Sequence, residues 1–378
     1  MDLTAYAVDG ISPSRVERPS TAEEVSAVMS AADRDRAAVV VFGGATRIDV
    51  GDAPSRYDVA LDMRGVKGIV EHSPADLVCV VRAGATLAEL ATELARHGQR
   101  WPVDVPDPER ATVGGTIASA ATGPSRLRHQ HVRDWVIGCE AVLGDGTRTR
   151  AGGRVVKNVT GYDLTRLYSG SFGTLAVLVE VSLKLVAVDE RICALALHDG
   201  DVARLASLAT ELRAALPLDA LVLATGDAAG GGATLTARCA GPLDAVERLA
   251  RDVRSRGAFV EIDEAAWRDL VSLPARSTHI ARAAMPPGRE TEALGGSAVA
   301  HVGAGSTFLL GERSSEELAS LRSRCEEVGG ALVVERTSTG QRRALGTWGR
   351  MRIPAEIARR LKERFDPHGV LAPGRMPV

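Results

Sequence analysis

Glycine-rich loops beside strands are the parts of this 378-residue chain that could carry chemistry. The first, Phe42-Gly-Gly-Ala-Thr-Arg47, directly follows a short β-branched run that predicts a buried strand. Glycine allows close backbone approach and positive φ, so successive N–H groups can curl around an anion such as pyrophosphate. Thr46 would add a hydroxyl and Arg47 a charge. A plain turn has the same pattern, and the loop lacks the GxGxxG spacing and the long following helix of a Rossmann site.

Two later stretches also collect small residues. The segment Pro106–Gly123 contains Thr112-Val-Gly-Gly115 and Ala118-Ser-Ala-Ala-Thr-Gly123, which leave room for a large, flat ligand. The segment 157–175 ends in Gly170-Ser-Phe-Gly-Thr-Leu175, which sets Gly173 and Thr174 at the start of a strand. Each stretch alone fits an ordinary loop or a tight packing surface. The three in this order are more specific than any one of them.

Helices and strands that would hold these loops can be placed from capping and periodicity. Thr21-Ala-Glu-Glu24 and Thr86-Leu-Ala-Glu89 read as capping boxes that begin helices. Short apolar runs predict strands over 38–42, 57–63, 77–82, 135–143 and 175–185. The order shows no regular βαβ alternation, which favours an α+β fold over a doubly wound sheet.

The pattern of expected helices and strands changes near residue 187. Helices are expected over 203–216 and 243–254, and strands over 221–225 and 233–239 flank a probable hairpin loop, Gly226–Gly232. The tail predicts an amphipathic helix over 354–365 with Ile357, Ala358, Leu361 and Phe365 facing inward. We therefore expect one domain over 1–186, a second α+β domain over 187–345, and a closing segment, 346–378, that returns to the first.

Charge and composition exclude several classes of function. The 46 Lys and Arg residues against 48 Asp and Glu give a net charge of −2, and aromatics are 3%, so a nucleic-acid partner is not expected. Five scattered cysteines with no CxxC argue against a cysteine-rich iron–sulfur or zinc site in this chain. No signal peptide and no ~20-residue apolar span is visible. A cytoplasmic protein is expected, with any membrane contact made through a partner.

The loops in their order carry a family resemblance. The stretch Thr21–Leu185 resembles the FAD-binding domain of the vanillyl-alcohol oxidase/p-cresol methylhydroxylase (PCMH-type) family, and within it the FAD-binding E subunits of bacterial glycolate oxidases. The run Val156-Lys-Asn-Val-Thr-Gly-Tyr-Asp-Leu164 is the most specific part, and 361–376 resembles the closing segment. The resemblance implies an α+β fold: a PCMH-type FAD-binding domain of two subdomains with a smaller, ferredoxin-like α+β cap.

The resemblance also implies a cofactor and its contacts. It places FAD with its pyrophosphate at the first loop, its ribityl chain and ring along the second, and further contacts from the strand that follows the third. The cofactor-binding residues so implied are Phe42, Gly43, Gly44, Ala45, Thr46, Arg47, Pro106, Thr112, Gly114, Gly115, Ala118, Ser119, Gly123, Asp134, Gly173, Thr174 and Val179.

Some residues depart from the family pattern. No His or Cys lies between Phe42 and Asp52, so FAD is expected to bind noncovalently. His301 matches one histidine of the catalytic relatives' cap motif, but its companions are absent, and no metal site is expected. His301 and Arg375 are the candidate catalytic residues, Arg375 because a guanidinium binds carboxylates bidentately. A lone histidine is more often structural, and Arg375 could equally be a surface residue.

The resemblance implies an FAD-dependent oxidoreductase acting on CH–OH groups. We expect the FAD-binding subunit of a 2-hydroxy-acid oxidase or dehydrogenase, with glycolate or D-lactate as substrate and hydride passing from the substrate α-carbon to the flavin. The implied partners are a catalytic flavoprotein and an iron–sulfur subunit. Two alternatives keep the flavin: a stand-alone alcohol oxidoreductase, and a non-catalytic assembly or electron-relay subunit. A third is a degenerate domain that binds no flavin.

Overall fold

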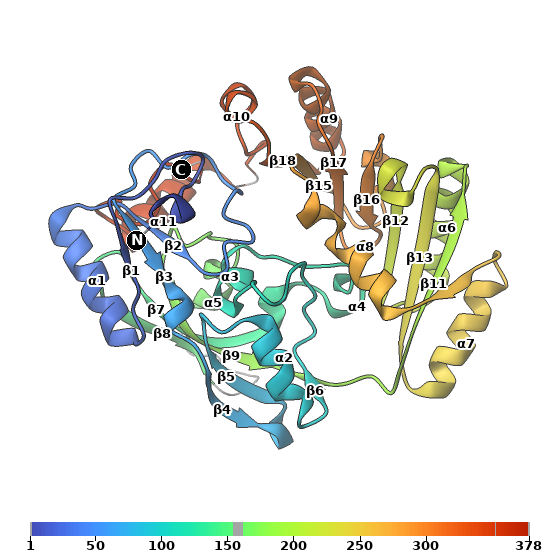
Figure 1. The fold of residues 1–378 in the computed structure, drawn as a ribbon, viewed down its shortest axis with the longest axis horizontal. Coiled ribbons are helices and arrows are strands. Elements are labelled where there is room, and N and C mark those ends of the chain that lie inside the picture. The colour runs from blue at the N-terminus through green and yellow to red at the C-terminus, as the bar shows by residue number, and fades with distance from the viewer. Residues whose placement is uncertain (1, 154–161, 352, 377–378) are drawn as a thin grey trace.

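The computed structural model describes residues 2–153, 162–351 and 353–376. Two units lie side by side (Figure 1), an N-terminal unit and an eight-stranded unit. The N-terminal unit holds a parallel sheet of order β1-β3-β2, made of Arg15–Glu17, Val59–Asp62 and Val39–Phe42. Its second sheet is antiparallel, of order β4-β5-β9-β7-β8, made of Ile69–Ser73, Val78–Arg82, Val177–Lys184, Val136–Val142 and Arg148–Gly152.

Helices of the N-terminal unit begin at the residues that capping predicts. Thr21 Oγ1 accepts from the Glu24 amide at the start of α1 (Ala22–Asp35). Thr86 and Glu89 form the full capping box of α2 (Leu87–Ala95), which buries Leu87, Leu90 and Leu94. The glycine-rich second stretch, Pro106–Gly123, forms α3 (Val113–Ala118), and α4 (Arg126–His129) follows it. Further elements are the 3-10 helices η1 (Thr4–Tyr6), η2 (Met63–Gly65), η3 (Pro74–Asp76) and η4 (Val132–Trp135), the helix α5 (Leu164–Tyr168) and the strands β6 (Gln99–Arg100) and β10 (Val186–Ala187).

The eight-stranded unit is one antiparallel sheet of order β14-β11-β13-β12-β16-β17-β15-β18. The predicted hairpin is confirmed, because β12 and β13 pair antiparallel around Gly226–Gly232. In chain order from β11 to β18, the strands are Arg191–Asp199, Ala220–Thr225, Ala233–Gly241, Val260–Ile262, Ile280–Ala284, Ala298–His301, Ser306–Leu310 and Ala331–Arg336. The helices are α6 (Val202–Ala215), α7 (Leu243–Arg254), α8 (Glu264–Arg276), α9 (Ser315–Glu327) and α10 (Thr339–Leu345).

Alternation along these strands decides which side chains face the N-terminal unit. Leu221 and Leu223 pack with α6 and α7, and Leu309 packs with α9, on one face. Val222, Val299 and Phe308 pack on the opposite face with α8. Because side chains alternate along a strand, His301, Arg282 and Glu335 share this second face with Ile280 and Phe308.

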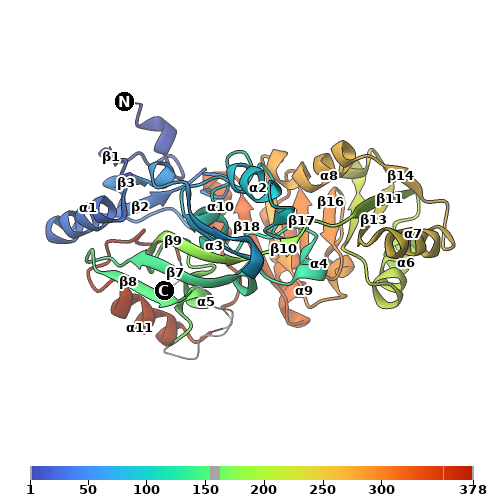
Figure 2. The same cartoon turned by 90° about the horizontal axis from the view of Figure 1, so that it is seen from below.

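The closing segment contacts the first parallel sheet. The Val39 amide donates to the Val370 carbonyl, and the Ala372 amide donates to the Val39 carbonyl. Helix α11 (Ala355–Phe365) lies on the side of the N-terminal unit (Figure 2), and its Lys362 Nζ donates to the Thr174 carbonyl at 2.7 Å. Ala358 is buried as predicted, but the prediction for Ile357 was wrong, since Ile357 is 50% exposed.

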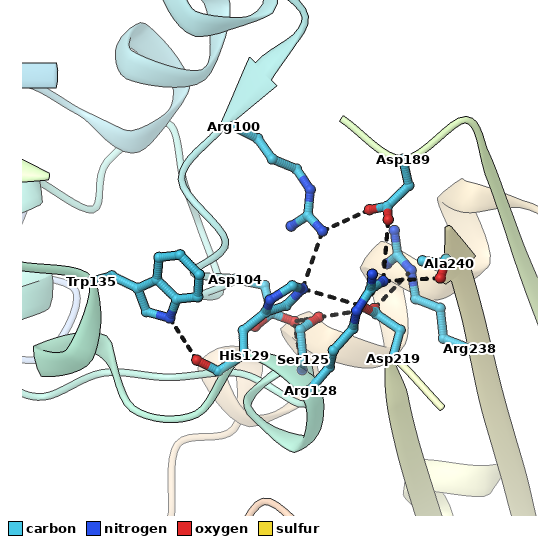
Figure 3. A network of polar contacts seen from close by, with 10 residues as sticks. All are labelled: Arg100, Asp104, Ser125, Arg128, His129, Trp135, Asp189, Asp219, Arg238 and Ala240. Atoms are coloured by element: carbon cyan, nitrogen blue, oxygen red, sulfur yellow. Dashed lines mark hydrogen bonds and ion pairs between the residues drawn. The ribbon is translucent and has the colours of Figure 1, made fainter. Parts of the chain in front are cut away.

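A network of charged side chains joins the two units (Figure 3). Arg100 donates to Asp189, and Arg128 donates to Asp189 and to the Ala240 carbonyl. Buried Asp219 lies 3.4 Å from His129, while Asp104 accepts from both the amide and hydroxyl of Ser125. The junction is therefore held by ion pairs. No helix in the described part of the chain is long and apolar enough to cross a bilayer.

Candidate functional site

The first glycine loop lines a cavity inside the N-terminal unit. Its walls come from β2 and the following loop, from α3, and from the start of β9. Of the residues proposed from the sequence, it holds Phe42, Gly43, Gly44, Ala45, Thr46, Arg47, Thr112, Gly114, Gly115, Ala118, Ser119, Gly173 and Arg375. The structure thus brings all three glycine-rich stretches to one place, although they are separated by tens of residues in the sequence.

The two glycines of the first loop act through close packing. A Cβ at Gly44 would lie 1.7 Å from the Arg110 carbonyl oxygen, and one at Gly43 would lie 2.2 Å from Thr112 Oγ1. Neither glycine has a positive φ, so that part of the expectation was wrong; Ala45 is the loop residue with φ of 57°. The glycines allow this loop to lie against the segment 110–112, which starts α3. Any side chain there would push the two cavity walls apart.

A second cavity, of about 290 Å³, opens where the two units meet. It shares Ala45, Thr46, Arg47 and Ser119 with the first cavity, so the two cavities adjoin at this loop. Pro106 and Gly123 line it from the N-terminal unit, and His301 lines it from the eight-stranded sheet. Its apolar wall is made of Val105, Ala121, Val271, Pro274, Ile280 and Phe308.

An ion-pair cluster stands at the polar end of the second cavity. Glu335 accepts from Arg47 Nη2 at 2.7 Å and from Arg282 Nε at 2.5 Å. Burial acts to raise the pKa of Glu335, but the two guanidinium groups outweigh it and lower the pKa to about 2. Glu335 is therefore ionised at neutral pH. Two cations share one carboxylate, so the cluster keeps one uncompensated positive charge.

His301 lies on the same sheet face as that cluster. Its side chain is buried, its ring centroid is 5.1 Å from that of Phe308, and its Nε2 has no hydrogen-bond partner within the described residues. Burial lowers the pKa of His301 to about 3. The imidazole is therefore neutral at physiological pH, and its free nitrogen can exchange a hydrogen bond with a bound molecule.

The network at the junction positions the wall of the second cavity. A Cβ at Gly123 would lie 2.6 Å from Asp104 Cγ, so Gly123 permits Asp104 to reach Ser125. Asp104 and Asp219 both contact Ser125, as Figure 3 shows. The loop that carries Thr122 and Gly123 is thus tied to the eight-stranded unit by the same groups that join the two units.

Three of the residues proposed from the sequence lie outside both cavities. Thr174 is buried, with its hydroxyl donating to the Ser171 carbonyl. Val179 packs in the core beneath α1, while Ala176, Val177 and Leu178 line the first cavity. Asp134 accepts from the His131 amide and pairs with Arg166. The residues of the family motif from Val156 to Gly161 lie outside the described residues.

Several cavity residues were missed from the sequence. Glu335, Arg336, Ile280 and Phe308 reach the second cavity from a region with no family motif. No strand was predicted from the sequence at these positions, and the sequence of a strand does not say which of its faces meets another unit. Phe172, which lines the first cavity, has a φ of 51° in Gly170-Ser-Phe-Gly173, a strained position that the glycines alone did not reveal.

The residues present fit a dinucleotide. Close packing at Gly43 and Gly44 leaves a cavity walled by loop backbone from Phe42 to Ile48, which suits a phosphate group. The adjoining second cavity is flanked by small residues and by an apolar wall, which suits a flat ring. Arg375 Nη1 and Arg47 Nε are buried without hydrogen-bond partners in the described chain, and both residues line the first cavity.

Comparison with known proteins agrees with this fit. Residues 13–152 match a family model described as an FAD binding domain. The chain is 37% identical over 170 residues to D-lactate dehydrogenase of Archaeoglobus fulgidus, which covers 45% of this chain and 38% of that protein. It is 39% identical over 153 residues to glycolate oxidase subunit GlcE of Escherichia coli, which covers 40% of this chain and 43% of that protein.

The structural comparison extends further along the chain. A solved alkyldihydroxyacetonephosphate synthase superposes with a TM-score of 0.70 at 16% identity, covering 95% of this chain and 75% of that one. This likeness shows the fold alone, and the chain spans about two fifths of the length of the curated relatives it matches. The resemblance is confirmed: residues 13–152 match an FAD binding domain, and the chain is similar to a glycolate oxidase subunit.

Proposed function

We propose that this chain is the FAD-binding subunit of an enzyme that oxidises a 2-hydroxy acid such as glycolate or D-lactate. The observation that carries the proposal is that the two cavities adjoin, with Ala45, Thr46, Arg47 and Ser119 lining both. One cavity suits the phosphates, and the other has room for the ring beside a polar cluster. The names of the relatives, D-lactate dehydrogenase and glycolate oxidase subunit, support the substrate class.

The protein's own groups can bind and orient such a substrate. Bound FAD supplies the acceptor for hydride from the substrate α-carbon. The uncompensated positive charge shared by Arg47 and Arg282 attracts the substrate carboxylate, and Glu335 holds the two guanidinium groups in place. Neutral His301 meets the substrate hydroxyl through Nε2 and fixes its direction. The apolar wall with Phe308 excludes water from the reacting carbon.

This assignment moves the carboxylate-binding role away from Arg375. Arg375 lines the first cavity, and His301 lines the second, so the two residues do not share a wall. His301 stays a candidate catalytic residue, as a hydrogen-bonding group. We also propose the division into residues 1–186, 187–345 and 346–378, which the course of the sheets supports.

Noncovalent FAD is part of the proposal. Among the described residues that line the two cavities there is no cysteine, and His301 is the one histidine. Acid precipitation of the purified protein tests this: the yellow colour should stay in the supernatant. Colour that remains in the pellet would show a covalent bond.

The implied partners follow from the relatives' names as subunits. We propose a catalytic flavoprotein and an iron–sulfur subunit, in the cytoplasm, with membrane contact through a partner. Co-expression of this chain with a candidate catalytic flavoprotein and a candidate iron–sulfur subunit, followed by affinity purification, should recover a complex. Substrate-dependent bleaching of the flavin, measured for the chain alone and for the complex with glycolate, D-lactate and D-2-hydroxyglutarate, tests the activity.

One observation favours a second candidate, a non-catalytic flavin-bearing relay or assembly subunit. Each arginine that lines the second cavity is already paired within the protein: Arg47 with Glu335, Arg110 with Asp107, and Arg336 with Asp49. A pocket of paired cations binds a carboxylate less strongly than one with a free cation. Flavin that is reduced by light but never by a hydroxy acid, alone or in the complex, would favour this candidate.

A further inference from the structure

Arg375 is a buried cation with one free edge. Its side chain is 3% exposed, and its Nη2 donates to the Ile48 carbonyl at 2.6 Å and to the Val50 carbonyl at 2.5 Å. Its Nη1 is buried and has no hydrogen-bond partner among the described residues. An unpaired donor of a charged group is costly inside a protein, so Nη1 calls for an acceptor that the described chain does not provide.

Arg375 also lacks a counter-ion. No carboxylate of the described chain forms an ion pair with it, and the aspartates whose charge it feels include Asp49, which pairs with Arg336, and Asp52, which accepts from the Thr347 amide. Burial, and the charge of neighbouring Arg342, lower the pKa of Arg375 to about 10, so the group remains a cation at neutral pH. Buried cations are normally paired with anions.

The position of Arg375 identifies the missing anion. The residue lines the first cavity together with the loop from Phe42 to Ile48. Its approach depends on Gly51, which has a φ of +120° and whose Cβ would lie 3.1 Å from Arg375 Nη2. The carbonyls of Ile48 and Val50 hold Nη2 and so fix the plane of the guanidinium. The other terminal nitrogen of the same guanidinium, Nη1, has no partner among the described residues, and Arg375 borders the cavity.

We infer that Arg375 is a phosphate-binding residue of the dinucleotide site, where its Nη1 donates to the pyrophosphate of FAD. The closing segment thereby adds a guanidinium that has no carboxylate partner among the described residues, whereas Arg47 of the first glycine loop is paired with Glu335. The inference rests on FAD binding and holds whether or not this chain oxidises a hydroxy acid. It replaces the expectation that Arg375 binds the substrate carboxylate.

The test compares two ligands that differ in phosphate. The full chain, freed of flavin, is titrated by calorimetry with ADP, which carries the pyrophosphate, and with adenosine, which does not. In R375Q we expect ADP affinity to fall about tenfold to a hundredfold, as for the loss of a charge-assisted hydrogen bond, with adenosine affinity unchanged. Equal losses for both ligands, or no loss for ADP, would overturn the inference.

Arg342 provides the matched control. It is also buried, and its Nη1 donates to the carbonyls of Asp49 and Gly51 in the same loop, yet it lines neither cavity. R342Q should lower the unfolding temperature while leaving the ratio of ADP to adenosine affinity as in the natural chain. A ratio that falls equally in R342Q and R375Q would mean that both arginines act through loop structure, which contradicts direct phosphate binding.

Two lysine variants, R375K and R342K, provide the same test if R375Q does not fold. R375K keeps the charge, but one ammonium cannot hold two loop carbonyls and a phosphate in the geometry of a planar guanidinium. The ADP-to-adenosine ratio should fall in R375K and not in R342K. An unchanged ratio in both variants would overturn the inference.

Discussion

Glu335 accepts a hydrogen bond from Arg47 Nη2 at 2.7 Å across 288 residues of sequence, and the same carboxylate oxygen accepts from Arg282. Arg47 belongs to the glycine loop of the FAD-binding domain, whereas Glu335 and Arg282 stand on β18 and β15 of the eight-stranded sheet. One buried carboxylate thus connects the cofactor loop to the other unit at the edge of the second cavity.

Replacing Glu335 by Gln should destabilise the protein strongly. The substitution keeps the shape but leaves two guanidinium groups beside each other without an anion, and breaking a buried pair in this way costs about 3–5 kcal/mol. Denaturant unfolding at pH 7 measures the change. Glu363, in an exposed pair with Arg359 on α11, is the matched control, and E363Q should change the free energy of unfolding by about 0.5 kcal/mol or less. Equal effects of the two variants would contradict the role given to Glu335.

Replacing Gly44 by Ala should abolish FAD binding. The new Cβ would lie 1.7 Å from the Arg110 carbonyl, so the loop must move away from the start of α3 and open the first cavity. The ratio of visible flavin absorbance to protein absorbance after purification reports the loss. Gly200 has no heavy atom near its Cβ position and no positive φ, so G200A should retain full flavin. An unchanged flavin-to-protein ratio in G44A would contradict this prediction, because it would show that the loop can move away from the Arg110 carbonyl without loss of FAD.

Stability should decrease when the pH falls below about 6.5, and His301 should account for part of the decrease. Burial lowers the pKa of His301 to about 3, so the unfolded chain takes up a proton at His301 that the folded chain does not. Each such histidine lowers the free energy of unfolding by about 1.4 kcal/mol per pH unit below its unfolded pKa. H301Q should make the dependence between pH 6.5 and 5 less steep in denaturant titrations.

The effects of His301 and Glu335 on stability fall in different pH ranges. The pKa of Glu335 is lowered to about 2, so its stabilising effect is complete above its ordinary value of 4.5 and is lost below it. His131, whose pKa burial and Arg126 lower to about 4, contributes in the same window as His301. An unchanged slope between pH 6.5 and 5 in H301Q would mean that His301 gains a proton in the folded state.

Replacing Asp219 by Asn should loosen the junction of the two units. Asp219 is buried beside His129, Arg128 and Arg238, at 3.4 to 3.8 Å, and its loss leaves these groups without their shared carboxylate. We expect a loss of about 3 kcal/mol in the free energy of unfolding and faster proteolysis between the units. Asp269, exposed and paired with Arg276, is the control: D269N should be close to neutral.

The helices could be predicted because their signals are local, and the cofactor because the glycine-rich stretches in their order carry a family resemblance. The capping box of Thr86 and Glu89 and the apolar spacing of Leu87, Leu90 and Leu94 need no tertiary partner. The glycine pairs mark the places where two backbones, or a backbone and a ligand, come close. Even there the reason differed: Gly43 and Gly44 are required by packing against residues 110–112 and have no positive φ.

The substrate side of the site could not be predicted in this way. The strand β18 was not predicted, and the sequence of a strand does not say which of its two faces meets another unit, so Glu335 carried no signal. From the sequence, Arg375 was a candidate carboxylate-binding residue near a terminus. In the structure its side chain is buried, donates to the loop carbonyls of Ile48 and Val50, and lines the first cavity.

The sequence by itself therefore determined the capped helices, because short-range spacing of caps and apolar residues specifies them, and its glycine-rich motifs in their order carried the resemblance to an FAD-binding domain. Only the tertiary structure decided which charges meet. Arg47, Arg282 and Glu335 come from three distant segments, and the pairing of buried charges depends on distances that arise only when the two units pack together.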